Sequence, residues 1–316
     1  MAGQTANGTV QVGKKPLRQR MKKYWGFYFM FIPVLVFVAL FHYAPMFGIR
    51  YAFYSWKIVG DPVWVGLANF EKLFKQSQFS VSFWNTVVFS VIKLVLNTGF
   101  AVIISLLLNE MISLKFKKLS QTIIYLPHFM SWVVTASVFS LLLSPSESGL
   151  VNQILIKLGI INESIYYLAD KGWWRIWYYV INVWHDTGWQ TIIFMATLTG
   201  IDPGIYEAAS IDGAGRWKKM WYVTMPALGN TIITVLILNL AKIMNLFESV
   251  FVLQNDSVKR ATNVLQTYVY YQTFNSGASA DYGYTTAIGL FRSLVGLCLM
   301  LICNYASKRV RGRGII

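Results

Sequence analysis

The sequence predicts an all-α polytopic membrane protein with six transmembrane helices, and two observations support that prediction. Of the 316 residues, 55% are hydrophobic and only 13% are charged, with a mean hydropathy of +0.48. Soluble domains carry about 25% charged residues, so a water-soluble fold of this length would lack the polar groups to cover its surface. Six apolar stretches are also each about 20 residues long, the length of helix that crosses a hydrocarbon core of ~30 Å.

These stretches divide the chain into a basic tail, 1–23, a membrane domain, 24–306, and a second basic tail, 307–316. Lipid offers no partner to unpaired backbone amides, so each span is expected to be helical. The first run is longer than a signal-peptide core and lacks a small-residue cleavage site, so it is expected to remain as a span. The expected spans are 24–44, 86–108, 121–143, 176–199, 230–253 and 286–306.

The distribution of basic residues predicts the orientation. Sixteen Lys and Arg residues lie on the side that holds both termini and the loops 109–120 and 200–229, and nine lie on the other side. With the acidic residues included, the two sides carry about +12 and +2. Cytoplasmic loops hold the excess of Lys and Arg, so both termini and the 200–229 loop are expected in the cytoplasm. The net charge of +15 therefore indicates orientation in a lipid bilayer, and no nucleic-acid partner is expected.

Two outer loops are expected to contain short surface helices, because their apolar residues recur at helical spacing. One set is Leu67, Phe70, Leu73 and Phe74, and the other is Val151, Ile154, Leu155 and Leu158. Before the fourth span lies an aromatic cluster that fits an interfacial belt, with a sugar-stacking platform as the alternative. Its members are Trp173, Trp174, Trp177, Tyr178 and Tyr179.

The 200–229 loop is expected to form a helix–turn–helix. Asp202 can cap the first helix and Pro203 suits its first position. Gly213 and Gly215 are expected to break that helix, since glycine tolerates the backbone angles of a tight reversal. A second helix is expected over 216–223, ended by Pro226. The hairpin could rest on lipid headgroups through its basic residues, or it could dock another protein on its small residues.

This loop resembles the cytoplasmic motif of permease subunits from binding-protein-dependent ABC importers: Glu-Ala-Ala, three residues, Gly, nine residues, Ile-x-Leu-Pro. The matching residues are Glu207, Ala208, Ala209, Gly213, Val223, Met225 and Pro226, with Asp212, Gly213 and Ala214 as the Asp-Gly-Ala core. Val and Met replace Ile and Leu. Other segments resemble sugar permeases, including "WVGLANFEKLF" and "WHDTGWQTIIFMATLTGIDPGIYEAASIDGAG". The segment "FHYAPMFGIRYAF" is most similar to permeases for oligo- and polysaccharide fragments.

The resemblance implies a type I ABC importer permease in the plasma membrane of a prokaryote. The implied partners are a second permease, favouring a heterodimer, two ABC ATPase subunits, and an extracellular sugar-binding protein or lipoprotein that delivers a carbohydrate. In such a complex the Glu-Ala-Ala helix sits in a groove of the ATPase. Glu207 would offer its carboxylate there and Gly213 would set the turn.

The chain is expected to be a transport subunit with no catalytic residues and no metal site. It contains no Gly-x4-Gly-Lys-Ser/Thr loop, so ATP and Mg are expected in the partner ATPase subunits. The three histidines are far apart in the sequence. Cys298 and Cys303 lie in one apolar run, where thiols behave as small hydrophobic groups.

Polar residues inside the expected spans are candidates for a substrate pathway, because a charge in the bilayer usually faces the bundle interior. They are Lys93 and Asn97 in the second span, Asn182, His185, Asp186, Trp189 and Gln190 in the fourth, Asn239, Lys242, Asn245, Glu248 and Ser249 in the fifth, and Arg292 in the sixth. The alternative is pairing between helices, such as Asp186 with Lys242 or Arg292. Lys93, Asp186, Lys242 and Arg292 are each about 6–11 residues from the outer end of their spans, so they are expected at a similar depth in the membrane. The excess of cations over carboxylates in this layer favours an acidic sugar.

Two other classes compete with the importer. An ion-coupled secondary transporter would be expected to show broken spans and an internal repeat, and no repeat relates 24–143 to 176–306. A membrane-embedded enzyme would need an acidic, nucleophilic or metal constellation, which the sequence does not suggest.

Overall fold

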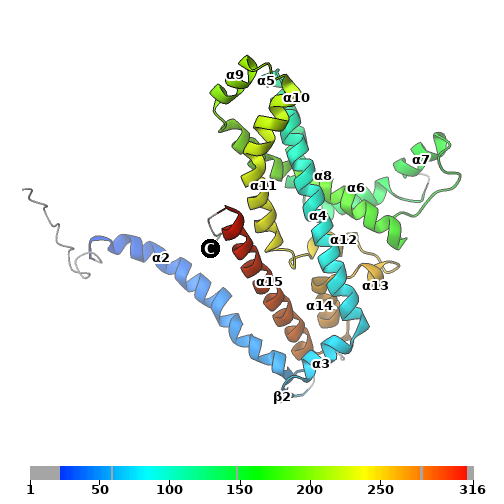
Figure 1. Ribbon diagram of the computed structural model, residues 1–316. Helices are drawn as coiled ribbons and strands as arrows, with labels where there is room; N and C mark the ends of the chain where they lie inside the picture. Colours follow the sequence, from blue (N-terminus) through cyan, green and yellow to red (C-terminus); the bar gives the residue numbers. More distant parts are fainter. Residues whose placement is uncertain (1–21, 58–59, 147–148, 278–279, 312–316) are drawn as a thin grey trace, which may run out of the picture. The chain divides into compact units, whose positions relative to one another are not determined.

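The computed structural model describes residues 22–57, 60–146, 149–277 and 280–311, and these are mostly helical (Figure 1). The strands in this part of the chain are β1, Tyr54–Ser55, and β2, Val63–Trp64, which pair antiparallel. The all-α prediction is therefore confirmed. Most of the predicted basic N-terminal tail, and residues 312–316 of the C-terminal one, lie outside the described residues. The chain divides into two units, Met1–Arg50 and Tyr51–Ile316.

The first unit contains the first expected span. Helix α2, Trp25–Val38, continues through a π turn, η1, Ala39–Tyr43, into the 3-10 helix η2, Ala44–Phe53, which runs into the second unit. Together they form an apolar helical segment of 29 residues, Trp25–Phe53, long enough to cross a membrane. Its start agrees with the predicted span 24–44.

In the second unit, α4, Ser77–Asn109, packs along α8, Lys171–Thr199. Figure 1 shows α4 running between the end formed by α3 and β2 and the end formed by α5, α9 and α10. Near the second end a cluster of buried side chains joins the two helices to α11, Met225–Leu240. Its largest fully buried members are Phe194, Leu108 and Leu228.

The third expected span, 121–143, is not one continuous helix but a bent pair of helices. Helix α5, Leu114–Tyr125, passes into the 3-10 turn η3, Leu126–Phe129, and the next helix, α6, Trp132–Leu142, is bent away by 102°. Pro127 disfavours continued α-helix, and Met130 adopts an extended conformation. Ser131 then caps α6 by accepting a hydrogen bond from the amide of Val134.

The fifth expected span, 230–253, is also broken. Helix α11 ends at Leu240, residues 241–244 form turns, residues 245–247 are irregular, and α12, Glu248–Leu253, follows. Turn hydrogen bonds satisfy part of the opened backbone, including Lys242 amide to Asn239 carbonyl at 3.0 Å and Asn245 amide to Lys242 carbonyl at 2.9 Å. The break contains neither Gly nor Pro, so hydropathy and local breaker signals both miss it.

Pro226 does not end a helix as expected. Helix α10, Arg216–Lys219, leads through a π turn, η4, Met220–Thr224, directly into α11, and the stretch Arg216–Leu240 is one apolar segment. A proline ring displaces the carbonyl four residues earlier, here that of Tyr222. The wider π turn accommodates this displacement, because its hydrogen bonds join residues five apart.

Within the residues that the structure describes, four helical segments and one bent pair are long and apolar enough to cross a membrane. They are Trp25–Phe53, Ser77–Asn109, Arg216–Leu240 and Tyr282–Arg309, with Leu114–Phe129 and Trp132–Leu142 as the pair. Helix α8 has 29 residues, but its polar stripe and many Trp and Tyr residues lower its hydropathy. The last helix, α15, Tyr282–Arg311, extends into the region expected as a tail.

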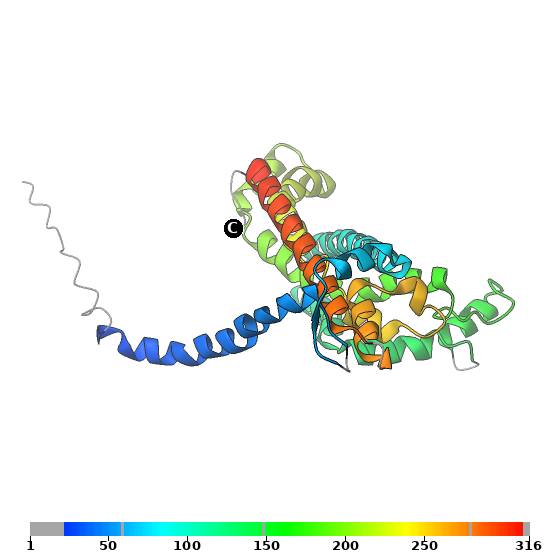
Figure 2. The same cartoon turned by 90° about the horizontal axis from the view of Figure 1, so that it is seen from below.

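Both surface helices predicted for the outer loops are present, as α3, Ala68–Lys75, and α7, Leu150–Lys157. Asn69 of α3 donates to the carbonyls of Ala52 and Tyr54 at 2.9 and 2.8 Å. In Figures 1 and 2, α7 projects away from the long helices.

The remaining helices are α9, Pro203–Ile211, α13, Lys259–Thr262, and α14, Leu265–Phe274, which packs against α15.

The aromatic cluster before the fourth span is partly a core. Trp174 and Tyr178 are fully buried and stack with ring centroids 5.1 Å apart, and the Trp174 indole donates to the Leu253 carbonyl at 2.8 Å. Neither an interfacial belt nor a sugar platform describes these two residues. At the start of α8, Asp170 accepts hydrogen bonds from the amides of Trp173 and Gly172, which lower the pKa of its carboxyl group.

Candidate functional site

A polar cavity of about 160 Å³ lies between α4, α8 and the broken fifth span. It gathers six of the predicted pathway residues from three elements. Its lining residues are Ser90, Lys93, Leu94, Asn97, Gln190, Asn239, Lys242, Ile243, Asn245 and Leu246. The break positions the last four, because a continuous helix would carry Asn245 and Leu246 onward along the axis.

The cavity offers hydrogen-bond donors and acceptors of several kinds. Asn97 is buried, and its side-chain oxygen has no hydrogen-bond partner among the described residues. Lys242 is exposed and makes no ion pair within the part of the chain that the structure describes. Amides can both donate and accept, and an ammonium only donates, so this lining suits hydroxyl and carboxylate groups.

Asp186 is the centre of a charge network beside this cavity. Its carboxylate lies 2.8 Å from the Lys93 ammonium and 2.6 Å from Nδ1 of His185. The Lys93 contact joins α4 to α8, so Asp186 takes part in pairing between helices, which was the alternative to a substrate pathway. Its partner is Lys93 and not Lys242 or Arg292, because α4 packs directly against α8.

Two histidines that are distant in sequence meet at this network. His128 Nδ1 lies 3.8 Å from Asp186, and the rings of His128 and His185 have centroids 5.8 Å apart. His128 also stacks on Trp189, and Trp132 on His185, which ties η3 and α6 to α8. Gly188 of α8 allows the end of α5 to pack closely against it, since a Cβ at Gly188 would lie 2.2 Å from the carbonyl oxygen of Ile124.

His128, His185 and Asp186 offer ligand atoms within 4.8 Å of one another, which is compact enough for a metal ion. The chemistry of the cluster favours an ion-pair network instead. The Lys93 ammonium already neutralises the carboxylate, and Nδ1 of His185 contacts the same group. A cation bound at this cluster would be repelled by the Lys93 ammonium, which lies 2.8 Å from the other oxygen of the same carboxylate.

The other predicted pathway residues do not join the polar cavity. Asn182 is buried and donates to the Tyr178 carbonyl one turn earlier at 2.7 Å. Ser249 is buried 3.4 Å from the Tyr178 hydroxyl, and Glu248 is exposed in the first turn of α12. Arg292 lines a separate cavity. The candidate pathway residues of the fourth and fifth spans thus lie in three different places: the buried core, the charge network around Asp186 and the polar cavity.

The Glu-Ala-Ala segment forms a second candidate site. Asp202 caps α9 by accepting from the Gly204 amide at 2.9 Å, as predicted. At the other end the Gly213 and Ala214 amides donate to the Ser210 and Ala209 carbonyls, with Gly213 at φ +76°. This pattern is a Schellman cap, which requires a left-handed residue and explains the Asp-Gly-Ala core.

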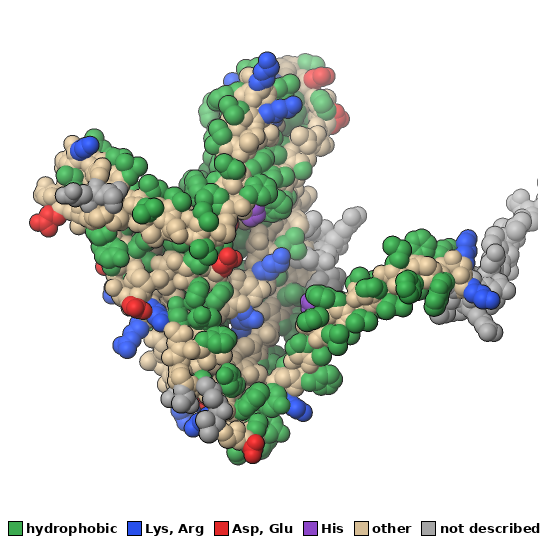
Figure 3. All heavy atoms as spheres, turned by 180° about the vertical axis from the view of Figure 1, so that it is seen from behind, with side chains coloured by type: hydrophobic (Ala, Val, Ile, Leu, Met, Phe, Trp, Pro, Cys, Tyr) green, Lys and Arg blue, Asp and Glu red, His purple; other side chains and the backbone are tan. Residues whose placement is uncertain are grey.

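Side-chain bonds tie α9 to the helix that follows it. Lys219 Nζ donates to Ser210 at 2.6 Å, and the hydroxyls of Tyr206 and Thr224 lie 3.0 Å apart. Glu207, Ala208, Asp212 and Gly213 are exposed. Figure 3 shows hydrophobic, basic and acidic side chains together at this end of the second unit. Its exposed large apolar side chains include Ile205, Ile211, Trp217, Trp221 and Tyr222.

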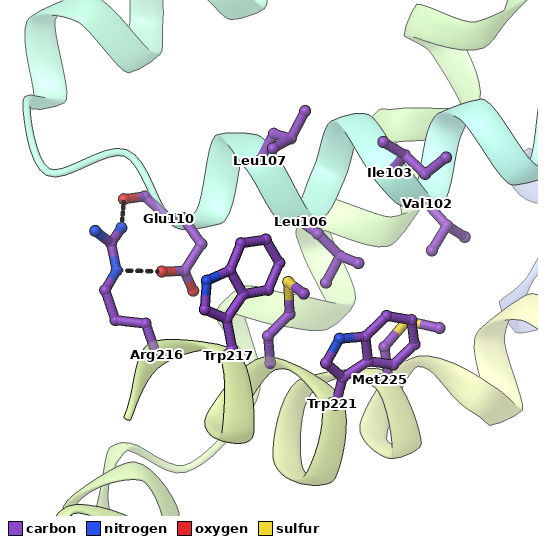
Figure 4. Close-up of a pocket in the computed structure, with 10 residues that line it drawn as sticks. Val102, Ile103, Leu106, Leu107, Glu110, Arg216, Trp217, Trp221 and Met225 are labelled. Atoms are coloured by element: carbon purple, nitrogen blue, oxygen red, sulfur yellow. Dashed lines mark hydrogen bonds and ion pairs between the residues drawn. The ribbon is translucent and has the colours of Figure 1, made fainter. Parts of the chain in front are cut away.

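An apolar groove of about 500 Å³ lies between the end of α4 and the stretch formed by α10, η4 and the start of α11 (Figure 4). Trp217 and Trp221 project across it toward Leu106 and Val102. At one end Arg216 binds Glu110, through Nε to the carboxylate and Nη2 to the backbone carbonyl, both at 3.0 Å. This pairing is not apparent in the sequence, because it depends on how α4 ends.

Comparison with known proteins agrees with this arrangement. The chain is 37% identical over 313 residues to the polygalacturonan/rhamnogalacturonan transport system permease protein YteP of Bacillus subtilis (strain 168), with 96% of this chain and 95% of that protein covered. It also matches a chain in the crystal structure of a bacterial ABC transporter involved in the import of the acidic polysaccharide alginate. There the TM-score is 0.85 and the identity 31%, with 93% of this chain and 99% of the other covered.

A second crystal structure, of a bacterial alginate ABC transporter in complex with an alginate pentasaccharide-bound periplasmic protein, matches with the same TM-score of 0.85 and the same 31% identity. It covers 95% of this chain and 99% of the other. Broken spans, which we expected of an ion-coupled transporter, therefore do not separate the two classes. Residues 98–312 match the model of one family, and the chain belongs to it: the binding-protein-dependent transport system inner membrane components.

Proposed function

We propose that this permease imports an oligosaccharide through a pathway that includes the polar cavity. The observation that carries the proposal is the meeting of Lys93, Asn97, Gln190, Asn239, Lys242 and Asn245 around one cavity in an otherwise apolar chain. A sugar presents many hydroxyl groups, and each needs a partner once it leaves water. Amide side chains supply such partners without adding charge.

The substrate we favour is acidic. Lys93 is neutralised by Asp186, which leaves Lys242 as a cation of the cavity with no acidic partner among the described residues. A carboxylate group on the sugar would neutralise the Lys242 ammonium. A relative named for polygalacturonan transport, and a similar solved structure of a transporter for the acidic polysaccharide alginate, support the same choice.

The α9–α10 segment is the proposed docking site of an ATPase subunit. Glu207 and Asp212 would contact the ATPase, and the small side chains of Ala208 and Ala209 would allow it to approach closely. Gly213, Ala214 and Pro226 would determine the backbone conformation of the segment. ATP and Mg would be bound by two such ATPase subunits and not by this chain. A second, different permease would complete the pathway, and an extracellular sugar-binding protein or lipoprotein would deliver the substrate. This assignment places both termini in the cytoplasm.

Copurification tests the docking site. In cells that express the whole transporter, tagged permease carrying Glu207→Lys should lose the ATPase subunits, because a reversed charge then meets the same surface. Glu71→Lys is the matched control, as Glu71 is an exposed acid on α3, at the other end of α4. Retention of the ATPase by both variants, with normal uptake, would contradict the proposal.

Uptake tests the substrate. Cells or proteoliposomes that contain the complete transporter should take up oligogalacturonate in preference to a neutral oligosaccharide of the same length. Lys242→Gln should reduce this preference, since it removes the unpaired cation and keeps hydrogen-bonding capacity. A strict preference of the wild type for neutral chains would exclude the acidic substrate, and absence of any sugar uptake would exclude carbohydrate import.

A further inference from the structure

A second cavity, of about 360 Å³, lies between α14, α15 and the end of the broken fifth span. Aromatic rings form a continuous series along one side of it. The ring centroids of Phe247 and Phe251 are 5.0 Å apart, those of Phe251 and Tyr270 4.7 Å, and those of Tyr270 and Phe274 5.1 Å. Three of these residues, Phe247, Tyr270 and Phe274, line the cavity itself.

Arg292 of α15 brings a positive charge to this aromatic cavity. Its side chain is half-buried, and it makes no ion pair, hydrogen bond or ring contact with any residue that the structure describes. A guanidinium removed from water is stabilised when an anion or several acceptors bind it. None of the residues that line the cavity is Asp or Glu, so the lining itself supplies no counter-charge.

The lining also carries uncharged polar groups. Gln266 and Thr273 line the cavity from α14, beside residues of the aromatic series. Pockets that bind small polar ligands combine apolar and aromatic walls with a few convergent polar groups. This cavity has that composition, with one cation, one amide and one hydroxyl.

The broken span connects the second cavity to the first. Lys242, Asn245 and Leu246 line the polar cavity, and the next residue, Phe247, lines the aromatic one. The segment 242–247 thus contributes lining residues to both cavities. A chain of linked sugars could contact both sides of this segment, which a single sugar ring could not.

We propose that the aromatic cavity binds a uronic acid residue of the transported oligosaccharide. Arg292 forms a bidentate ion pair with the carboxylate, a geometry that a guanidinium matches and an ammonium does not. Tyr270 and Phe247 pack against the apolar face of the ring, and Gln266 and Thr273 bind hydroxyl groups. The proposal rests on the proposed function, and it adds a carboxylate-specific subsite beyond the polar cavity.

A KM comparison tests this subsite in proteoliposomes that contain the complete transporter. The two probes are a galacturonate trimer and the same trimer with its carboxyl groups reduced to primary alcohols. Arg292→Gln should raise the KM for the acidic trimer about ten-fold or more, the effect of losing one charge-assisted pair. The KM for the reduced trimer should change less than about two-fold, because this trimer has no carboxylate group to form an ion pair with Arg292.

Two further variants sharpen the test. Arg292→Lys keeps the positive charge but loses the bidentate geometry of the guanidinium group. It should therefore raise only the KM for the acidic trimer, and by less than Arg292→Gln does. Arg260→Gln is the matched control, since Arg260 is an exposed arginine on α13 outside both cavities. It should leave both KM values unchanged.

Several outcomes would overturn the inference. Equal KM changes for both trimers, or no change for either, would show that Arg292 does not bind the carboxylate. An effect of Arg292→Gln that depends only on the anionic lipid content of the vesicles would assign the cavity to a lipid headgroup. A wild type that transports neither trimer would instead contradict the proposed function, so the two failures are distinguishable.

Discussion

At the scale of single residues, Asp186 shows how this protein keeps a charge inside an apolar helix bundle. The carboxylate lies 2.8 Å from Lys93 and 2.6 Å from His185, and Asp186 and Lys93 are only 19% and 24% exposed. A charge left without its partner in such a place is strongly unfavourable, whereas removing both partners costs far less. Lys93 therefore acts first as the counter-ion of Asp186, although it lines the polar cavity.

A double-mutant cycle should reveal this coupling. Lys93→Met and Asp186→Asn should each lower thermal stability in detergent, and the double variant should be more stable than the sum of the two losses predicts. We expect a coupling free energy of about 1–3 kcal/mol, as for residues in one buried ion-pair network. Lys242→Met is the control, because Lys242 has no acidic partner among the described residues. Strict additivity of Lys93→Met and Asp186→Asn would refute the network.

The pairing of Asp186 also marks a limit of sequence analysis. Counting residues from the end of each span predicted that Lys93, Asp186, Lys242 and Arg292 lie at a similar depth. Depth along a helix axis does not determine direction around it, or which helices are neighbours. The choice of Lys93 over Lys242 or Arg292 depends on the packing of α4 against α8, which no local pattern encodes.

At the scale of elements, the motif of the 200–229 loop was predictable because each of its features is local. Asp202 caps α9, Pro203 occupies its first turn, and Gly213 adopts the left-handed conformation. The breaks near Met130 and over 241–247 were not predicted. Pro127 precedes the first, but the bend there is also held by a long-range contact, the stacking of Trp132 on His185 of another helix. The second contains neither Gly nor Pro. A hydropathy window measures composition, and the bent pair Leu114–Phe129 and Trp132–Leu142 still passes as apolar enough to cross a membrane.

Gly213 provides a test of the loop geometry. Gly213→Ala should destabilise the end of α9 by about 1–2 kcal/mol, because an L-residue is strained at φ +76° even though a Cβ there would meet no atom within 4 Å. Gly215→Ala is the matched control, since Gly215 has φ −72° and equally open space. Hydrogen exchange of the amides in 206–214 should accelerate in the first variant only. Equal exchange in both variants would mean that the Schellman cap contributes little.

At the scale of the whole second unit, α4 links the two candidate sites. Lys93 and Asn97 of α4 line the polar cavity, and Glu110, next to its last residue, binds Arg216 of α10. At 1.5 Å per residue, Lys93 and Glu110 lie about 25 Å apart along the axis. In the proposed complex, a displacement of α9 and α10 by an ATPase subunit would reach the cavity through this one helix, as in domain motions that move packed elements as bodies.

Arg216→Gln should separate stability from transport. The Arg216–Glu110 pair is largely exposed, so its loss should change the unfolding free energy by only about 0–1 kcal/mol. The reconstituted transporter should nevertheless take up several-fold less sugar per ATP hydrolysed, because α10 would lose both of its hydrogen bonds to Glu110. Lys218→Gln, an exposed neighbour, should behave as the wild type. Exchanging the charges in Glu110→Arg/Arg216→Glu should restore part of the coupling. If Arg216→Gln kept the wild-type ratio of sugar to ATP, transmission would have to run through the apolar contacts of Trp217 and Trp221 instead.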